Sequence, residues 1–513
     1  MKWLICLLFL LPLGSHAQSG TDPLSTRILQ PADMQADFRY LRRLLEETHP
    51  GLYRYTPKAA MQARLDSLDR SLDQPQPFYR FFKTVSALMA DIRCAHTHAL
   101  PSKNWLEQFN RNLKTIPFFL FPFEKRSYVL FNGTSDKTIQ PGFEVLSING
   151  QPMDEIRQQV YRYYWTDGSI EASRSSALRG ELFSLFYYWY LGQPETYSFT
   201  FRSLTGDTVR FEAPAKPFRS WLRDVKKNPV NKQMLAWYNK KKPKHPWRLS
   251  FPEDIPQTAY LRFDGFGGYG ASNGEQAVST FRKFMDESLE KMAKKDVRNL
   301  IVDLRDNRGG WDSQGIELFT YLAKGDSAVP YYTRQHSVTD SSEFLKFSDL
   351  SEEDRKNVKN ELIPEPDGTF TLKQGSDTRE PKRYEPKPNR FRGKVYILMN
   401  GQSVSTASEF LAVAHANRVG VFIGEESGGA YEGGNGSSFI NLELPKSGIQ
   451  VSTPLVYYRN AVPEPAQPGR GTFPDHAVPT TIVNLLEHRD AQGEFVKKLI
   501  LKPETGTTTV QNR

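Results

Sequence analysis

The apolar positions near the start of the chain recur every three or four residues, which predicts amphipathic helices. Three such segments follow one another: residues 33–48, 59–72 and 77–92. The first of them stops at His49-Pro50-Gly51, a strong signal for the end of a helix. The sequence therefore predicts a helical N-terminal domain, to which we assign residues 18–115.

From residue 116 the pattern changes to short apolar runs separated by turns, which predicts strands. The run that begins at Gly142 is a predicted strand that enters an Asn149-Gly150 turn. Residues 196–212 have the alternation of a hairpin, and an aromatic-rich segment of mixed helical character precedes them. We therefore predict a second, β-rich domain over residues 116–215.

Strands and helices alternate in the second half of the chain, which predicts an α/β layer with crossover connections. The predicted strands are residues 258–263, 298–304, 394–399 and 419–423, and the predicted helices are residues 274–293, 313–324 and 406–417. We assign this layer to residues 256–505. A charged, proline-rich stretch at residues 326–392 interrupts it as an insertion, and we expect residues 506–513 to form a disordered tail.

The composition, 38% hydrophobic and 24% charged residues, fits a soluble globular protein with several domains. Residues 1–17 have the basic start, apolar run and small-x-small ending of a secretory signal peptide, so the mature chain would begin near Gln18. No later run is long enough for a membrane helix. We therefore expect an extracytoplasmic protein, periplasmic or secreted. Outside the signal only Cys94 remains, so we expect no intramolecular disulfide.

Much of the net charge of +9 lies in one segment, Arg223 to Arg248, where lysines are mixed with prolines and aromatic residues. A basic segment can meet nucleic acid or an anionic surface. No nucleic-acid-binding motif accompanies this one. We therefore interpret residues 216–255 as a solvated basic linker and expect no nucleic-acid partner.

A serine at a strand-to-helix turn is the strongest chemical signal in the chain. Asn400-Gly401 ends the predicted strand 394–399, and Thr406 and Glu409 have the spacing of a capping box at the start of a helix. Ser405 therefore lies at a helix N-terminus, where free backbone N–H groups stabilise an alkoxide or an oxyanion. These residues alone leave two interpretations open, a nucleophile or a simple helix cap.

Two glycine-rich loops follow predicted strands of the α/β layer. Gly309-Gly310 follows the strand 298–304 and either aims N–H groups at an oxyanion or forms a plain turn. Residues 424–436 lack the Gly-Lys-Ser/Thr ending of a phosphate-binding loop. We therefore expect no nucleotide cofactor.

Four blocks of the α/β layer carry a family resemblance. They are LIVDLRDNRGG (300–310), NGQSVSTASEF (400–410), FIGEESGGAYEGG (422–434) and FPDHAVPT (473–480). In combination they resemble the serine peptidase family that includes the tail-specific, C-terminal-processing proteases and the tricorn core. The segment GFEVLSINGQPM (142–153) resembles part of a PDZ domain, and ETHPGLY (47–53) resembles the N-terminal domain of exported bacterial members. The resemblance implies a ClpP/crotonase-like catalytic core, a PDZ-like domain and a helical N-terminal domain.

The resemblance places the nucleophile at Ser405, five positions after the asparagine of the turn. Counting back from Glu409 would place it at Thr406, and this alternative stays open. In the family the oxyanion is bound by the backbone of the Gly-Gly loop and of the residue after the nucleophile. The resemblance thus assigns that role to Gly310, Gly309 and Thr406.

The base departs from the tail-specific branch of the family, which uses a lysine. The matching position here is Ala430, and no lysine occurs from 418 to 445. The tricorn-like branch instead uses a histidine from the N-terminal side, and DIRCAHTH (91–98) resembles the block that supplies it, with His96 in that place. An imidazole with the usual pKa of about 6.5 can take the proton of Ser405 at neutral pH.

A third group should orient the histidine, as in other triads. The resemblance suggests Glu464, and Asp475 and Glu426 stay open. His96 and His98 also have the spacing of two zinc ligands on a strand, but no further cluster of ligands accompanies them, so we expect no metal.

The sequence therefore predicts an exported serine endopeptidase that hydrolyses peptide bonds through a Ser/His acyl-enzyme, acts on a peptide or protein and needs no cofactor. The alternative is a non-catalytic ligand- or peptide-binding protein on the same fold. The sequence indicates neither the substrate nor the oligomeric state.

Overall fold

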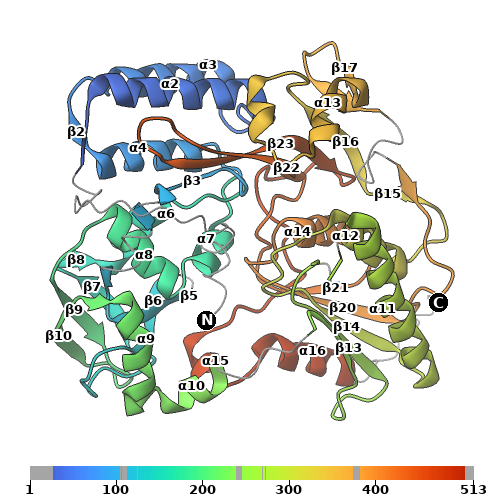
Figure 1. Ribbon diagram of the computed structural model, residues 1–513. Coiled ribbons are helices and arrows are strands. Elements are labelled where there is room, and N and C mark those ends of the chain that lie inside the picture. Colours follow the sequence, from blue (N-terminus) through green and yellow to red (C-terminus); the bar gives the residue numbers. More distant parts are fainter. Residues whose placement is uncertain are drawn as a thin grey trace, which may run out of the picture.

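The chain has a mixed α/β, multidomain fold that contains three six-stranded sheets with helices packed around them (Figure 1). These sheets are formed by the residues that the computed structural model describes: 27–103, 105–106, 113–123, 125–238, 245–267, 270–271, 273–373 and 382–502. The predicted signal peptide, residues 1–17, and the predicted tail, residues 506–513, lie outside them. No helix of this described part is both long and apolar enough to cross a membrane.

Three helices lead the described chain and match their predicted ranges to within two residues. They are α2 (Pro31–Thr48), α3 (Lys58–Arg70) and α4 (Phe78–Asp91). Pro31 opens α2, because proline has no N–H to lose in the first turn of a helix. The short strands β1 (Ile28–Leu29) and β2 (Gln76–Pro77) pair beside these helices.

An antiparallel sheet in the order β10-β9-β7-β6-β5 follows, with β8 paired to β7. Its strands are β5 (Phe118–Phe123), β6 (Arg126–Asn132), β7 (Glu144–Ile148), β8 (Gln151–Pro152), β9 (Thr196–Arg202) and β10 (Thr208–Pro214). Its helices are α6 (Met153–Tyr161), α7 (Glu171–Ala177) and α8 (Glu181–Tyr190). This sheet shares one hydrophobic core with α2, α3 and α4, in which Phe82 stacks on Tyr190 with 5.6 Å between ring centroids. The predicted boundary after residue 115 therefore does not divide two separate cores.

The predicted α/β layer is a sheet in the order β12-β13-β14-β20-β21-β24, parallel from β13 onwards. Its strands are β12 (Trp247–Ser250), β13 (Thr258–Phe263), β14 (Asn299–Asp303), β20 (Lys394–Met399), β21 (Val421–Gly424) and β24 (His476–Ala477). Three helices connect successive strands and pack on one face: α11 (Gly274–Lys294), α12 (Asp312–Leu322) and α14 (Thr406–Ala416). Helix α16 (Ala491–Leu501) packs on the other face. Because β14 and β20 are parallel neighbours, the loops that follow them lie at the same edge of the sheet, where such sheets bind ligands.

The predicted basic linker is folded rather than solvated coil. It contains β11 (Lys216–Pro217), α9 (Phe218–Lys227), η1 (Pro229–Asn231) and α10 (Lys232–Tyr238), and β12 adds to the parallel sheet. Trp221, Val225 and Met234 bury their side chains in a cluster with the β5 and β6 side of the antiparallel sheet. The sequence analysis missed this apolar face because lysines flank the few apolar residues that form it. Residues 239–244 of this segment lie outside the described residues.

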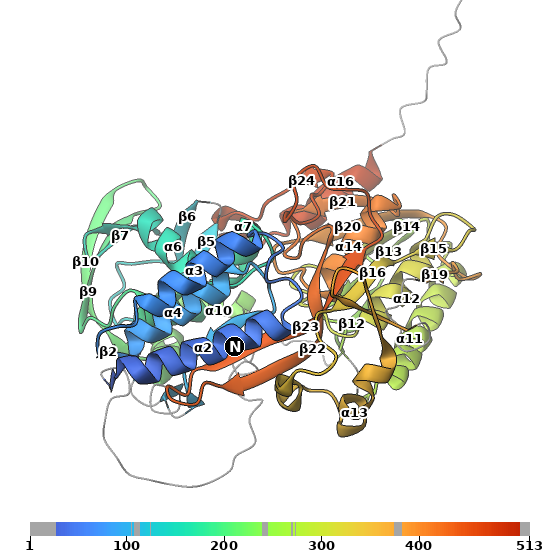
Figure 2. The same ribbon diagram turned by 90° about the horizontal axis from the view of Figure 1, so that it is seen from above.

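The predicted insertion helps to build the third large sheet, in the order β17-β18-β16-β23-β22, with β3 (His98–Leu100) also paired to β23. Its long hairpin is β22 (Gly433–Glu443) and β23 (Gln450–Asn460), and β16 (Tyr332–Ser337), β17 (Leu362–Pro364) and β18 (Phe370–Leu372) come from the insertion. Seen from above, this hairpin passes beside α2, between the N-terminal helices and the parallel sheet (Figure 2). The pairing of β3 with β23 therefore joins the segment after His96 to the C-terminal half of the chain.

The remaining elements are short or peripheral. They are β4 (Lys114–Thr115), β15 (Val329–Pro330), η2 (Glu343–Phe347), α13 (Glu352–Glu361), β19 (Arg383–Tyr384) and α15 (Ile482–Leu486).

Candidate active site

Ser405 lies on a strained turn between β20 and α14. It is the N-cap residue of α14, with φ 54° and ψ −135°, and its side chain makes no capping hydrogen bond. A non-glycine residue in this region of backbone space is held there by its surroundings, and such positions cluster at functional sites. A serine on a strained strand-to-helix turn is also the arrangement of the nucleophile elbow. Its side chain lines a cavity of about 800 Å³.

The predicted capping box is wrong, because α14 begins at Thr406 and no side-chain cap bond forms. Glu409 instead accepts a hydrogen bond from the Tyr332 hydroxyl. The hydroxyl of Thr406 is buried, 2.9 Å from the carbonyl oxygen of Gly310 and 3.0 Å from a carboxylate oxygen of Asp312. Thr406 therefore ties α14 to the neighbouring loop, whereas Ser405 is the residue of the pair that lines the cavity.

Polar contacts with the loop after β14 hold this turn in place. The Asn400 side chain accepts a hydrogen bond from the backbone N–H of Asp306 (3.0 Å) and donates one to its carboxylate (3.0 Å). The Ser403 hydroxyl donates to the carbonyl oxygen of Leu304 at 2.8 Å. Because both ends of each bond follow adjacent parallel strands, the two loops are fixed to each other at the edge of the sheet.

The Gly309-Gly310 loop passes so close to Ser405 that only glycine fits. Gly309 has φ 83° and Gly310 has φ 142°, which L side chains rarely adopt. A Cβ at Gly309 would lie 2.6 Å from Cβ of Ser405, and one at Gly310 would collide with the carbonyl oxygen of Phe266. The loop is fixed on its far side by a hydrogen bond from the N–H of Phe266 to the carbonyl oxygen of Gly309, 2.9 Å long.

Two backbone N–H groups beside Ser405 are available to a ligand. Within the described part of the chain, neither the N–H of Gly310 nor that of Thr406 donates a hydrogen bond. The N–H of Thr406 also stands in the first turn of α14, where the helix dipole favours negative charge. The Thr406 nitrogen would lie only 2.9 Å from a Cβ on Gly309, so this amide stands against the glycine loop. The arrangement suits an oxyanion next to the Ser405 hydroxyl.

His96 lines the same cavity, although it lies far from Ser405 in the sequence. Its ring packs against Phe439 of β22, with 5.5 Å between centroids, and a Cβ at Gly436 would lie 3.9 Å from its Cε1. Its Nδ1 is buried and has no hydrogen-bond partner among the described residues. The structure thus brings together the two residues that the sequence proposed as nucleophile and base.

His98 faces a different environment from His96. Its ring stacks on Trp165, with 4.7 Å between centroids, and burial lowers its pKa from 6.5 to about 4. The described residues contain no cluster of histidine, cysteine and carboxylate side chains that would hold a metal ion.

The three carboxylates considered for orienting His96 have other partners. Glu464 pairs with Arg459, and its side chain is 78% exposed. Asp475 accepts from the N–H of Phe422 at 2.8 Å. Glu426 forms an ion pair with Arg470. None of the three lines the cavity.

Three carboxylates that sequence reasoning passed over do line the cavity: Glu275, Asp312 and Glu409. Glu409 is buried in α14 beside the Tyr332 hydroxyl, and Asp312 opens α12. The spacing in the sequence could have pointed to Glu409. It stands four residues after Ser405, about one helical turn, and so faces the same side of α14.

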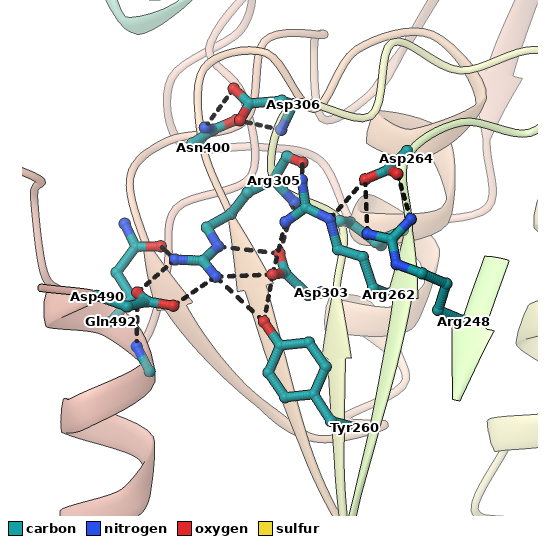
Figure 3. Close-up of polar contacts among 12 residues, drawn as sticks. Arg248, Tyr260, Arg262, Asp264, Asp303, Arg305, Asp306, Asn400, Asp490 and Gln492 are labelled. Atoms are coloured by element: carbon teal, nitrogen blue, oxygen red, sulfur yellow. Dashed lines mark hydrogen bonds and ion pairs between the residues drawn. The ribbon is translucent and has the colours of Figure 1, made fainter. Parts of the chain in front are cut away.

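A buried ion cluster holds the start of the loop that follows β14 (Figure 3). The carboxylate of Asp303, the last residue of β14, is 1% exposed and pairs with Arg262 (2.6 Å) and Arg305 (2.7 Å). Burial alone would raise the pKa of Asp303, but the two guanidinium groups hold it well below its usual range. Arg305 also pairs with Asp490 at the N-terminus of α16, 2.6 Å away. The cluster therefore ties the start of the 305–310 loop to the C-terminal helix.

Comparison with known proteins identifies the domain that holds Ser405. Residues 257–475 match the family model described as peptidase family S41. This part of the chain is a family S41 peptidase domain. The chain is therefore a serine peptidase, and its family S41 domain contains the Ser405 turn and the glycine loop, whereas His96 lies outside it. No curated protein sequence matches the chain.

Solved structures share the fold over nearly the whole chain. The structure of mature CPAF is 14% identical, covers 92% of this chain and 96% of its own, and has a TM-score of 0.58. Mature CPAF complexed with lactacystin is 15% identical, covers 92% of this chain and 98% of its own, and has a TM-score of 0.60. At this identity the likeness demonstrates a common fold, which includes the regions on both sides of the cavity.

Proposed function

We propose that the protein is an exported serine endopeptidase in which Ser405 attacks the peptide carbonyl and His96 acts as general base. The observation that carries this proposal is that both side chains line one cavity of about 800 Å³, although different regions of the chain supply them. The buried position of the Thr406 hydroxyl supports Ser405 as the nucleophile.

In this mechanism His96 accepts the proton of the Ser405 hydroxyl as the oxygen attacks the carbonyl carbon. The tetrahedral oxyanion accepts hydrogen bonds from the N–H groups of Gly310 and Thr406, with Gly309 keeping the loop close enough for both to reach it. His96 then returns the proton to the leaving amine, which leaves an acyl-enzyme on Ser405. Water activated by the same imidazole releases the acid product.

The proposal rests on Ser405 and His96 rather than on a complete triad. Glu464 stays a prediction from the family resemblance, and its exposed position beside Arg459 gives it no support. The ring of His96 instead packs against Phe439.

The antiparallel sheet with α6 and α8 would be a PDZ-like domain that presents a peptide to the cavity.

Residues 1–17 would direct export of the protein. Export predicts a mature protein that starts near Gln18. Mass spectrometry of protein from the native cell envelope or medium would measure this start, and an intact residue 1 would contradict it.

A fluorophosphonate probe tests the chemistry directly, since it needs an activated serine. We expect labelling of the wild type and none of Ser405→Ala, with a loss of about 10⁶-fold in kcat on a peptide substrate. The control is Thr406→Ser, which keeps a hydroxyl against Gly310 and Asp312 and should still be labelled. Labelling that survives in Ser405→Ala would remove Ser405 from the mechanism, and no labelling of folded wild type would favour a non-catalytic binding protein.

A further inference from the structure

The structure assigns a positioning role to Asp167, a buried carboxylate between α6 and α7. We propose that Asp167 fixes the loop that carries His96 against the glycine-rich loop of the peptidase domain, and so sets the distance between base and nucleophile. This inference rests on the proposed Ser405 and His96 mechanism and names a residue that it requires.

Asp167 binds the backbone on each side of the interface. One carboxylate oxygen accepts a hydrogen bond from the N–H of Ala95, the residue before His96, at 2.8 Å. The other lies 3.4 Å from the N–H of Ala430 in the loop between β21 and β22. The Asp167 side chain is 6% exposed, so water does not compete with these bonds. The Asp167 carboxylate thus joins the His96 loop and the Ala430 loop, which lie far apart in the sequence.

The residues next to Asp167 strengthen the same junction. The N–H of Gly168 donates to the carbonyl oxygen of Arg93 at 3.0 Å, and the N–H of Ser169 donates to that of Gly469 at 2.9 Å. Gly168 has φ 50°, and a Cβ there would collide with the carbonyl oxygen of Gly469. The segment 167–169 is therefore clamped between the His96 loop and the peptidase domain.

Positive charge from Arg54 accompanies the buried carboxylate. Arg54 interacts electrostatically with Asp167, pairs with Glu432 at 3.0 Å and donates to the carbonyl oxygen of Gly433 at 2.9 Å. Glu432 also accepts from the N–H of Gly469 at 2.8 Å. Glu432 belongs to the same buried cluster, but its hydrogen bonds do not reach the residues around His96, so it provides a matched control.

Ala430, on the peptidase side of this junction, corresponds by sequence resemblance to a position that carries a base in another branch of the family. Ala430 is 3% exposed, and the resemblance of the sequence blocks aligns it with the base lysine of the tail-specific branch. Here its backbone N–H faces the carboxylate that also holds the His96 loop. Loss of that carboxylate would leave a buried N–H without an acceptor and free the loop to move. A displacement of about 1 Å at a catalytic group costs about 10²-fold in rate.

A double-mutant cycle distinguishes positioning of His96 from general support of the fold. The rate constant of fluorophosphonate labelling and its probe-concentration dependence are measured for wild type, Asp167→Ala, His96→Ala and the double variant. We expect Asp167→Ala to lower the maximal labelling rate about 10- to 100-fold with little change in probe affinity. In the His96→Ala background the same change should cost no more than about twofold, because the group that Asp167 positions is gone.

Two further variants serve as controls for misfolding and for a general effect of the buried cluster. Asp167→Asn preserves the volume and one acceptor oxygen, so it should fold and retain more activity than Asp167→Ala. Glu432→Gln should leave the labelling rate within about threefold of wild type, a difference below 1 kcal/mol. Thermal unfolding of each variant measures the contribution to the fold separately.

The outcomes separate this inference from the proposed function. Equal losses in the wild-type and His96→Ala backgrounds, or an unchanged rate in Asp167→Asn and Asp167→Ala, would overturn the role of Asp167 while the Ser405 mechanism stands. If labelling does not need Ser405, or is unchanged in His96→Ala, the proposed function itself fails.

Discussion

The turn that carries Ser405 and the loop that carries His96 are held in different ways. Contacts between neighbouring parallel strands fix the Ser405 turn, through Asn400 and Asp306 and through Ser403 and Leu304. Helix α7 also contacts this turn at Gly401. The His96 loop is not held by neighbouring parallel strands; the Thr97 hydroxyl and the His49 ring form a buried hydrogen bond of 2.7 Å at its end. The loop also depends on Asp167, on β23 through β3 and on the packing of Phe439.

The contacts that hold the peptidase domain therefore differ from those that bring the proposed pair, Ser405 and His96, to one cavity. Backbone strain, free N–H groups and the glycine loop belong to one sheet edge and form when that sheet forms. The proposed base, His96, comes from the region in which the N-terminal helices and the antiparallel sheet pack against β22 and β23 (Figure 2). Substitutions around Ser405 and substitutions around His96 should therefore differ in how strongly they change catalysis and stability.

The largest of these effects is expected on the histidine side. His96→Ala should lower acylation and kcat about 10²- to 10⁴-fold without changing stability much, since it removes the proton acceptor and leaves the cavity in place. The measurement is single-turnover acylation with thermal unfolding alongside. His98→Gln serves as the control, because that ring stacks on Trp165 away from the reacting groups. A comparable loss of acylation in both variants would point to damage of β3 rather than loss of a base.

Gly309→Ala tests the serine side, with an expected loss of about 10²- to 10³-fold in kcat. The added methyl would press on Cβ of Ser405 and on the N–H of Thr406, at a backbone angle that disfavours alanine. Binding of a substrate peptide, followed as KM or by calorimetry with the Ser405→Ala background, should change less. The control is Gly206→Ala in the β9–β10 turn, where a Cβ meets no atom within 4 Å. Unchanged kcat in Gly309→Ala would mean that this loop is not near the reacting carbonyl.

Asp303→Ala should destabilise the peptidase domain by about 3–5 kcal/mol at pH 7, because it leaves Arg262 and Arg305 without their buried partner. The pKa of Asp303 is depressed in the folded state, so its stabilisation is present above the unfolded pKa of about 3.9. It is lost as pH falls below that value. Denaturant unfolding at pH 7 and pH 3 measures this, and the gap between wild type and variant should narrow at pH 3.

The exposed ion pair of Asp254 and Lys497 offers the contrast to Asp303. Asp254→Ala should leave unfolding unchanged within error, since solvent and salt screen such a pair. An equal gap between wild type and Asp303→Ala at the two pH values would show that the ion cluster does not act through the charge of Asp303.

Glu464→Ala should have the smallest effect, within a few-fold of wild-type kcat, because the side chain is exposed and pairs with Arg459. The same kinetic assay measures it beside Arg459→Ala, which removes the other half of the pair. A loss of about 100-fold or more in kcat in Glu464→Ala alone would show that this carboxylate takes part in catalysis. It would also mean that Glu464 has a different position in the working enzyme.

Local patterns predicted most elements of the parallel sheet. The strands 258–263 and 394–399 have the observed bounds, and the helix predicted at 313–324 is α12 at Asp312–Leu322. These segments carry long apolar runs, buried on both faces or on a helical stripe, that local periodicity detects. The pattern failed between residues 216 and 238, because the apolar side chains of α9 and α10 are few and lysines surround them.

The sequence by itself determined the strand-to-helix turn, the two glycines and the presence of His96 in a block that resembles the histidine block of the tricorn-like branch, because each is encoded within a few neighbouring residues. Only the tertiary structure decided that Ser405 rather than Thr406 lines the cavity, that His96 rather than His98 joins it, and that Glu464 does not. Those outcomes depend on backbone angles at one residue and on contacts such as that of Asp167 with Ala95 and Ala430. Such contacts join distant segments whose spacing in the sequence carries no trace of them.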